Sequence, residues 1–291
     1  MTIRPIQQII RPQPTVEGAG VHLIRSIGTR QLTNLDPFLL LDHFESSTPA
    51  DYRAGFPFHP HRGIETVTIL RTGQVRHGDS LGHKGTLSGG DIQWMTSGSG
   101  ILHEEMPVVQ PEGISGLQLW LNLPAREKMT RPRYRDLRAD KLEERATDDG
   151  AKIRVIAGEA DGGRGRGPVE GLSVAPKFVD VQLPAGAVFR EEIPAGHTAF
   201  AYLDRGRVEF GAADAAMQSV DGPALVVFGD GDFIRARGSS KDGRFLLAAA
   251  RPLGEPIARY GPFVMNTREE IEETLDELRS GRFIREEAVD A

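Results

Sequence analysis

The sequence of 291 residues contains no cysteine. Disulfide bonds, thiolate catalysis and every zinc or iron–sulfur site built on cysteine are therefore excluded. Long apolar runs are also missing: none reaches the roughly 18 residues that a membrane-spanning helix needs, and residues 1–14 lack the continuous apolar core of a signal peptide. We therefore expect a cytoplasmic protein that has no membrane partner.

Basic stretches are scarce as well. Lys and Arg number 35 against 41 Asp and Glu, which gives a formal net charge of −6, and no long basic run occurs. A nucleic-acid-binding surface normally carries clustered positive charge, so we expect no direct contact with nucleic acid. Hydrophobic residues make up 39% of the chain and charged residues 26%, which is typical of a globular protein with an apolar core.

Glycine and proline punctuate the chain. The 34 glycines and 19 prolines separate short apolar runs at intervals of about eight to twelve residues, a spacing typical of an all-β sandwich or barrel. Turns are predicted at 72–73 and 77–80. The predicted strands cover residues 21–25, 37–44, 66–70, 92–95, 101–106, 116–123 and 152–156.

Residues 124–150 differ from their surroundings because charge density rises there and apolar residues become rare. We interpret this segment as a connector and place the boundary inside it, as the length of the chain favours two domains. The predicted domains are residues 1–134 and residues 135–291.

A helix is predicted at the end of the second domain. Thr267 and Glu270 have the spacing of a capping box. Ile271, Leu275 and Leu278 follow on one helical face, and Gly281 is placed to end the helix. We expect this short helix to dock on the protein itself rather than on a partner.

Two pairs of candidate metal ligands stand out. His59 and His61 are separated by one residue, as are His103 and Glu105. Side chains two positions apart lie on the same face of a strand, so two such strands side by side can aim three imidazoles and one carboxylate at one point. Pro60 cannot donate to a sheet and indicates a strand end or edge, where a ligand has access.

This ligand set suits Fe, Mn, Ni, Co, Cu or Zn better than Mg or Ca. On a six-coordinate metal, four protein ligands leave two positions open, which indicates catalysis, redox sensing or small-ligand binding. Two carboxylates compete with Glu105. Glu104 is expected on the opposite strand face from His103, whereas Glu65 is either a ligand or a hydrogen-bonding neighbour of a ligand. The other histidines, at positions 22, 43, 77, 83 and 197, are expected to be structural.

An internal repeat relates the two halves of the chain. Residues 63–75 align with residues 196–208, because both segments have two glycines ten positions apart, a strand-like run between them and a valine two positions later. In this alignment Glu192 and Pro194 take the positions of the histidine pair. We therefore expect the second half to be a copy of the first that holds no metal.

Four motifs resemble the pirin family of bicupins: FPFHPHRGIETV (56–67), GDIQWMT (90–96), GILHEEMP (100–107) and GPFVMNT (261–267). The resemblance implies an all-β fold of two jelly-roll-like cupin barrels packed together, with a short C-terminal helix. It also implies one metal ion, iron(II) first among the metals named above, in the N-terminal barrel. The resemblance implies that the metal ligands are His59, His61, His103 and Glu105, and that Glu65 is not a ligand.

The same resemblance implies a function. Some bacterial pirins resemble quercetin 2,3-dioxygenases, so the chain is expected to be an oxidoreductase that opens flavonols such as quercetin with O2 and releases carbon monoxide. The flavonol 3-hydroxyl would bind the metal, and Glu105 would be the catalytic base that accepts its proton. The alternative is a redox-responsive metal-binding regulator that contacts a transcription factor or a metabolic enzyme. A third hypothesis is a metal-binding bicupin with a different substrate.

Overall fold

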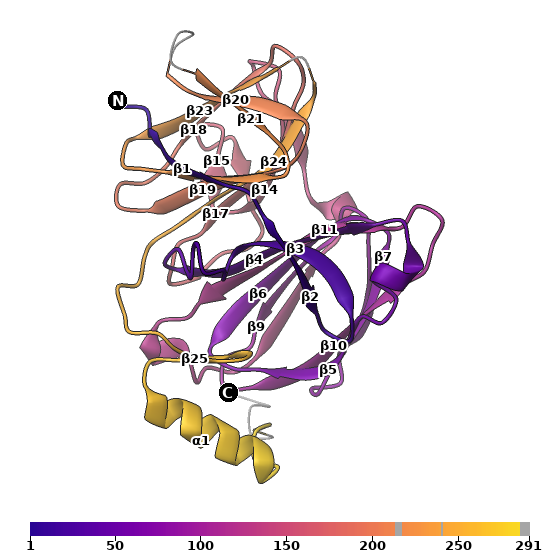
Figure 1. The fold of residues 1–291 in the computed structure, drawn as a ribbon. Helices are drawn as coiled ribbons and strands as arrows, with labels where there is room; N and C mark the ends of the chain where they lie inside the picture. Colours follow the sequence, from indigo (N-terminus) through magenta and orange to yellow (C-terminus); the bar gives the residue numbers. More distant parts are fainter. Residues whose placement is uncertain (213–216, 240, 286–291) are drawn as a thin grey trace. The chain divides into compact units, whose positions relative to one another are not determined.

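The structure, a computed structural model, describes residues 1–212, 217–239 and 241–285 (Figure 1). The chain divides into two compact units. The first unit comprises Gln13–Ala139 and Leu253–Ala291, and the second comprises Met1–Pro12 and Asp140–Pro252. Among the described residues, no helix is both long enough and apolar enough to cross a membrane.

The first unit is built from two antiparallel sheets, a terminal hairpin and one α-helix. Its strands are β2 (Gln13–Glu17), β3 (Val21–Ile27), β4 (Phe38–Ser46), β5 (Phe56–His61), β6 (Ile64–Thr72), β7 (Gln74–Asp79), β8 (Lys84–Ser88), β9 (Ile92–Thr96), β10 (Ile101–Val108), β11 (Ile114–Asn122), β12 (Arg133–Leu137), β25 (Ala258–Tyr260) and β26 (Phe263–Met265), and its helices are η1 (Pro49–Asp51), η2 (Ala125–Glu127) and α1 (Arg268–Arg279). The larger sheet has the order β12-β9-β6-β11-β4-β3-β2, and the smaller has the order β5-β10-β7-β8.

Strand β6 occupies the centre of the larger sheet, between β9 and β11. Its first seven residues are all buried, which explains why the run is rich in β-branched and apolar side chains on both faces. Each of the seven strands predicted from the sequence overlaps an observed strand. The turn predicted at 72–73 is also confirmed, because β6 ends at Thr72 and Gly73 adopts a left-handed φ of 87°.

The turn predicted at 77–80 is wrong, because β7 continues to Asp79. His77 and Gly78 pair with Glu105 and Glu104 of β10. The neighbouring strand therefore supplies the backbone hydrogen bonds that keep this polar, glycine-containing segment extended.

The second unit repeats the arrangement of the first. Its strands are β1 (Ile6–Ile10), β13 (Glu144–Ala146), β14 (Lys152–Ala157), β15 (Glu159–Ala160), β16 (Gly165–Arg166), β17 (Lys177–Leu183), β18 (Val188–Glu192), β19 (Thr198–Arg205), β20 (Arg207–Gly211), β21 (Met217–Asp221), β22 (Ala224–Phe228), β23 (Phe233–Gly238) and β24 (Gly243–Ala250), and η3 (Ala139–Lys141) precedes β13. Its sheets have the orders β1-β22-β19-β24-β17-β14-β13 and β18-β23-β20-β21. The aligned segments 63–75 and 196–208 form β6–β7 and β19–β20, so the sequence repeat marks equivalent strands.

Apolar side chains fill the interior of the second unit. Phe189, Phe210 and Phe245 are buried and in edge-to-face contact, with ring centroids 5.5 to 5.6 Å apart. Valines, alanines and leucines from both sheets complete this core.

Each end of the chain belongs to a different unit from the one that the expected domains 1–134 and 135–291 would give it. The first twelve residues belong to the second unit, where β1 pairs with β22. In the larger sheet of the first unit, the edge strand β12 comes from the connector and lies next to β9. In the second unit, the N-terminal strand β1 takes the equivalent edge position, next to β22. The hairpin β25–β26 and helix α1 belong to the first unit.

Helix α1 begins at the predicted capping box. Thr267 accepts a hydrogen bond from the backbone of Glu270, whose side chain accepts one from the Thr267 backbone. Arg62, which directly follows the histidine pair, holds the helix: its guanidinium donates to Thr274 Oγ1 at 3.0 Å and to Glu277 Oε2 at 2.6 Å, and it lies over the Phe283 ring. The helix is thereby fixed to the corner between β5 and β6.

We expect Arg62→Met to release helix α1. Glu277 would keep only its contact with Arg285 and lose a charge-assisted hydrogen bond to a fully buried arginine, a change worth about 1.5–3 kcal/mol, so amide hydrogen exchange in α1 should accelerate by about 10-fold or more. Arg268→Met is the matched control, because Arg268 pairs with Glu272 on the exposed face of the same helix. Equal exchange rates in the two variants would show that Arg62 does not anchor the helix.

Candidate metal centre

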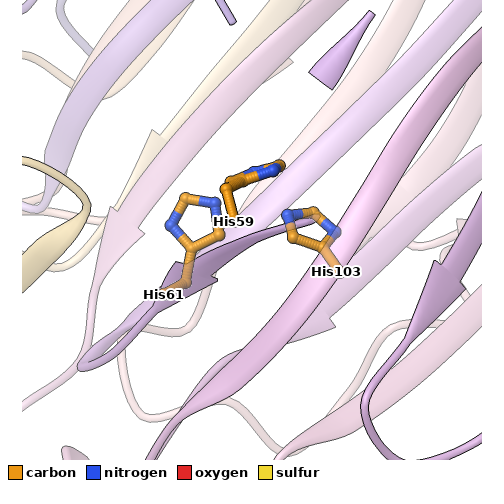
Figure 2. A group of neighbouring side chains, drawn as sticks. All are labelled: His59, His61 and His103. Atoms are coloured by element: carbon orange, nitrogen blue, oxygen red, sulfur yellow. The ribbon is translucent and has the colours of Figure 1, made fainter. Parts of the chain in front are cut away.

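Strands β5 and β10 bring three histidine side chains together. The strands are antiparallel neighbours, with His59 opposite His103 and His61 opposite Ile101. The ring centroids lie 4.4 Å apart for His59 and His103, 4.9 Å for His59 and His61, and 5.0 Å for His61 and His103. One nitrogen from each ring lies within 4.8 Å of the other two, and Figure 2 shows the three rings grouped together.

The hydrogen bonds of these rings suit a metal ion. His59 Nδ1 lies 2.9 Å from the Pro57 carbonyl oxygen, which leaves its Nε2 available. His103 Nδ1 lies 3.0 Å from the Tyr134 hydroxyl. Nitrogens His103 Nε2 and His61 Nδ1 are buried and have no hydrogen-bond partner among the described residues. Buried polar atoms rarely lack a partner, so this group can hold a metal ion through its free nitrogens.

Burial also keeps the rings in the form that binds metals. The pKa of His61 and the pKa of His103 are both held well below the ordinary value, first by burial and then by the neighbouring histidines. A histidine must be neutral to donate a lone pair to a metal. Each of these two imidazoles therefore keeps one nitrogen unprotonated, with its lone pair available to a metal.

Glu105 lies on the same strand as His103 but outside the compact group of three histidines. The pairing of β10 with β5 is irregular here: His103 faces His59, whereas Glu105 faces Phe56. This bulge adds a residue to β5, so Glu105 faces Phe56 rather than Pro57. Glu105 is buried, which raises its pKa, and its Oε1 accepts a hydrogen bond from Thr68 Oγ1 at 3.1 Å.

The rival carboxylates occupy other positions. Both oxygens of Glu65 are engaged, because Oε2 accepts from Trp94 Nε1 at 3.1 Å and Oε1 accepts from Thr96 Oγ1 at 2.8 Å. Glu65 is also outside the compact group, and burial raises its pKa. It supports the sheet between β6 and β9 rather than the back of a histidine. Glu104 points toward Gly78, away from the face that carries His103.

Tyr134 is a site residue that the sequence analysis missed. Its ring stacks on His77, with centroids 5.8 Å apart and planes 7° apart. His77 Nε2 in turn lies 3.1 Å from Asp136 Oδ2. Tyr134 follows the histidine motif by more than 70 positions in a charged connector, where only the pairing of β12 with β9 brings it to His103. His77, which the sequence analysis treated as structural, thus supports a residue that contacts the site.

We expect Tyr134→Phe to weaken metal binding by about 10- to 100-fold, the usual effect of losing a hydrogen bond to a metal-bound histidine. The phenyl ring retains the stack on His77, so the fold should persist. Calorimetric titration with the metal measures the change. Tyr52→Phe is the control, because the buried Tyr52 hydroxyl has no partner among the described residues. An unchanged affinity in Tyr134→Phe would contradict this role.

A cavity of about 600 Å³ adjoins the histidines within the first unit. Both sheets contribute to its wall, which includes His59, His61 and Glu105. Apolar and aromatic side chains form most of the remaining surface, among them Val21, Leu23, Leu40, Phe44, Tyr52, Phe56, Val75, Ile114 and Trp120. This size and lining are typical of a pocket for a small organic molecule.

Comparison with known proteins agrees with this arrangement. Residues 20–121 match the model of the Pirin family, and residues 178–284 match that of the Pirin C-terminal cupin domain. A pirin-like protein of Caulobacter vibrioides is 43% identical, over 97% of this chain and 100% of its own length. Human Pirin is 41% identical over 91% of this chain and 89% of its own length.

A solved structure shows the same fold. The crystal structure of a quercetin 2,3-dioxygenase from Acinetobacter baumannii matches with a TM-score of 0.85 and 33% identity, over 97% of this chain and 99% of that one. The predicted all-β bicupin fold with one short C-terminal helix is thus confirmed. From its motifs, its two matched domains and this overall likeness, the chain belongs to the pirin family.

Proposed function

We propose that this protein is a metal-dependent dioxygenase that opens flavonols such as quercetin with O2, using iron(II). The observation that carries the proposal is the group of three histidines at the wall of an apolar cavity of about 600 Å³. The likeness to a quercetin 2,3-dioxygenase supports it. In the proposed reaction both atoms of O2 enter the ring-opened ester, and one ring carbon leaves with its oxygen as carbon monoxide.

The proposed metal ligands are His59, His61, His103 and Glu105. When bound, the metal supplies a redox-active Lewis acid for the substrate hydroxyl and O2. The three histidines offer nitrogens that face one another, and Glu105 lines the same cavity. Aromatic side chains such as Phe56 and Trp120 exclude water and offer flat surfaces to a planar substrate.

Glu105 is the proposed catalytic base, and its surroundings allow it to hold a proton. Thr68 Oγ1 lies 3.1 Å from Glu105 Oε1 and 2.6 Å from Gln118 Oε1. While Glu105 is ionised, the threonine hydroxyl donates to it. Once Glu105 has taken the proton of the flavonol 3-hydroxyl, it can donate to Thr68 Oγ1 while that hydroxyl turns to Gln118. Either protonation state of the base therefore has a hydrogen-bond partner.

Oxygen consumption tests the proposal. Iron(II)-loaded protein with quercetin should consume O2 and release an equal amount of carbon monoxide, whereas His59→Ala treated in the same way should do neither. Metal-loaded protein that consumes no O2 with quercetin would overturn the dioxygenase proposal. The regulator hypothesis would then be favoured if a protein partner co-purified in stoichiometric amount.

A further inference from the structure

Two arginines line the cavity, and their partners differ. Arg25 is neutralised: its Nε and Nη2 donate to the two oxygens of Asp42, both at 2.7 Å, and its Nη1 lies 2.8 Å from Glu17 Oε1. This two-point pairing uses the geometry of the guanidinium fully. Arg25 therefore has little capacity left to bind a ligand.

Arg259 has no such partner. It forms no ion pair within 4.0 Å with any described residue, and its only hydrogen bonds are long ones to carbonyl oxygens, from Nε to Gly261 at 3.3 Å and from Nη1 to Leu39 at 3.4 Å. Its Nη2 donates to none of the described residues. Arg259 lines the cavity and is also exposed, which places it where the cavity opens to solvent.

Stacking on Trp120 holds this guanidinium in place. Its central carbon lies 4.9 Å from the centroid of the Trp120 ring. An arginine that stacks on an aromatic ring keeps its charge and its hydrogen-bonding edge while it loses conformational freedom. Arg259 is thus an oriented and permanently charged donor at the cavity opening.

Trp120 also connects Arg259 to the histidines. Its ring centroid lies 5.1 Å from that of His61. The Arg259 guanidinium and the His61 ring therefore both lie against the same tryptophan ring. A planar aromatic ligand that reaches His61 therefore lies within range of the arginine. The charge that a guanidinium binds best is a carboxylate or another ionised oxygen acid.

We propose that Arg259 binds an ionised acidic group of an aromatic ligand and makes the cavity selective for anionic aromatic molecules. This inference rests on the proposed function in that it treats the cavity as the substrate site. It narrows the substrate class to aromatic compounds that carry a carboxylate or a phenolate at the end facing the cavity opening. A flavonol ionised on its outer ring belongs to this class.

A pair of probes with one shape and different charge tests the inference. Calorimetric titration of the metal-loaded protein, without O2, should show that 2-naphthoate binds about 10- to 100-fold more tightly than 2-naphthamide, the effect of one charge-assisted hydrogen-bonded contact. Arg259→Gln should remove this preference and leave the affinity for the amide unchanged. Arg259→Lys should retain part of it. Arg76→Gln, which removes an exposed arginine that does not line the cavity, should match the wild type.

The possible results separate this inference from the proposed function. Equal affinities for the two probes, no binding of either, or a preference that survives in Arg259→Gln would each overturn the role of Arg259. The last result would mean that the carboxylate is bound by another group, such as the metal. Oxygen uptake with quercetin is measured independently: a charge preference lost in Arg259→Gln upholds the inference even if quercetin is not consumed.

Discussion

His103→Ala should abolish stable metal binding. The His103 ring centroid lies 4.4 Å from that of His59 and 5.0 Å from that of His61, and His103 is the one member of the group that β10 supplies. Without it, His59 and His61 are left on a single strand with two nitrogens for the ion. Loss of a ligand should exceed the roughly 10- to 100-fold effect of losing a neighbour of a ligand, so affinity is expected to fall by more than about 100-fold.

Elemental analysis of the purified variant and calorimetric titration with iron(II) measure this loss. His22→Ala is the matched control, because His22 is an exposed histidine of the same unit whose ring contacts Asp51 rather than the metal group. Circular dichroism should show that both variants are folded. A His103→Ala protein that binds iron as tightly as the control would mean that the three histidines are not the metal site.

Glu105→Gln loaded with excess iron(II) should lose the reaction. The amide has the shape of the carboxylate and retains a hydrogen bond with Thr68, but it cannot accept the proton of a flavonol hydroxyl. Removal of a general base typically lowers turnover by about 100- to 10,000-fold. Glu105 is also a proposed ligand, so the affinity for iron(II) should fall, but the three histidine nitrogens remain and an excess of iron(II) should still load the site.

The neighbouring residue supplies the control for this prediction. Glu104→Gln makes the same chemical change one position earlier, on the strand face that points toward Gly78. It should leave both iron content and oxygen uptake unchanged. If Glu105→Gln retains full turnover with iron bound, Glu105 is not the base, and the proton must be taken by another group.

Much of the candidate site could be predicted from spacing alone. Side chains alternate along a strand, so His59 and His61 must share a face wherever the strand is placed. The structure adds that β5 and β10 are neighbours with His59 opposite His103. The residue of β5 that Glu105 faces could not be predicted in the same way, because the bulge in β5 changes the register between two strands that are distant in the sequence.

The sequence by itself determined the local features: the strands, the capped helix, the repeat and the two ligand pairs. Each follows from the backbone geometry of a few consecutive residues, which acts before any long-range contact forms. Only the tertiary structure decided that Tyr134 meets His103, that Arg62 anchors α1, and that Arg259 stacks on Trp120. These contacts join segments far apart in the chain, and their geometry depends on how the sheets twist and pack, which no local pattern encodes.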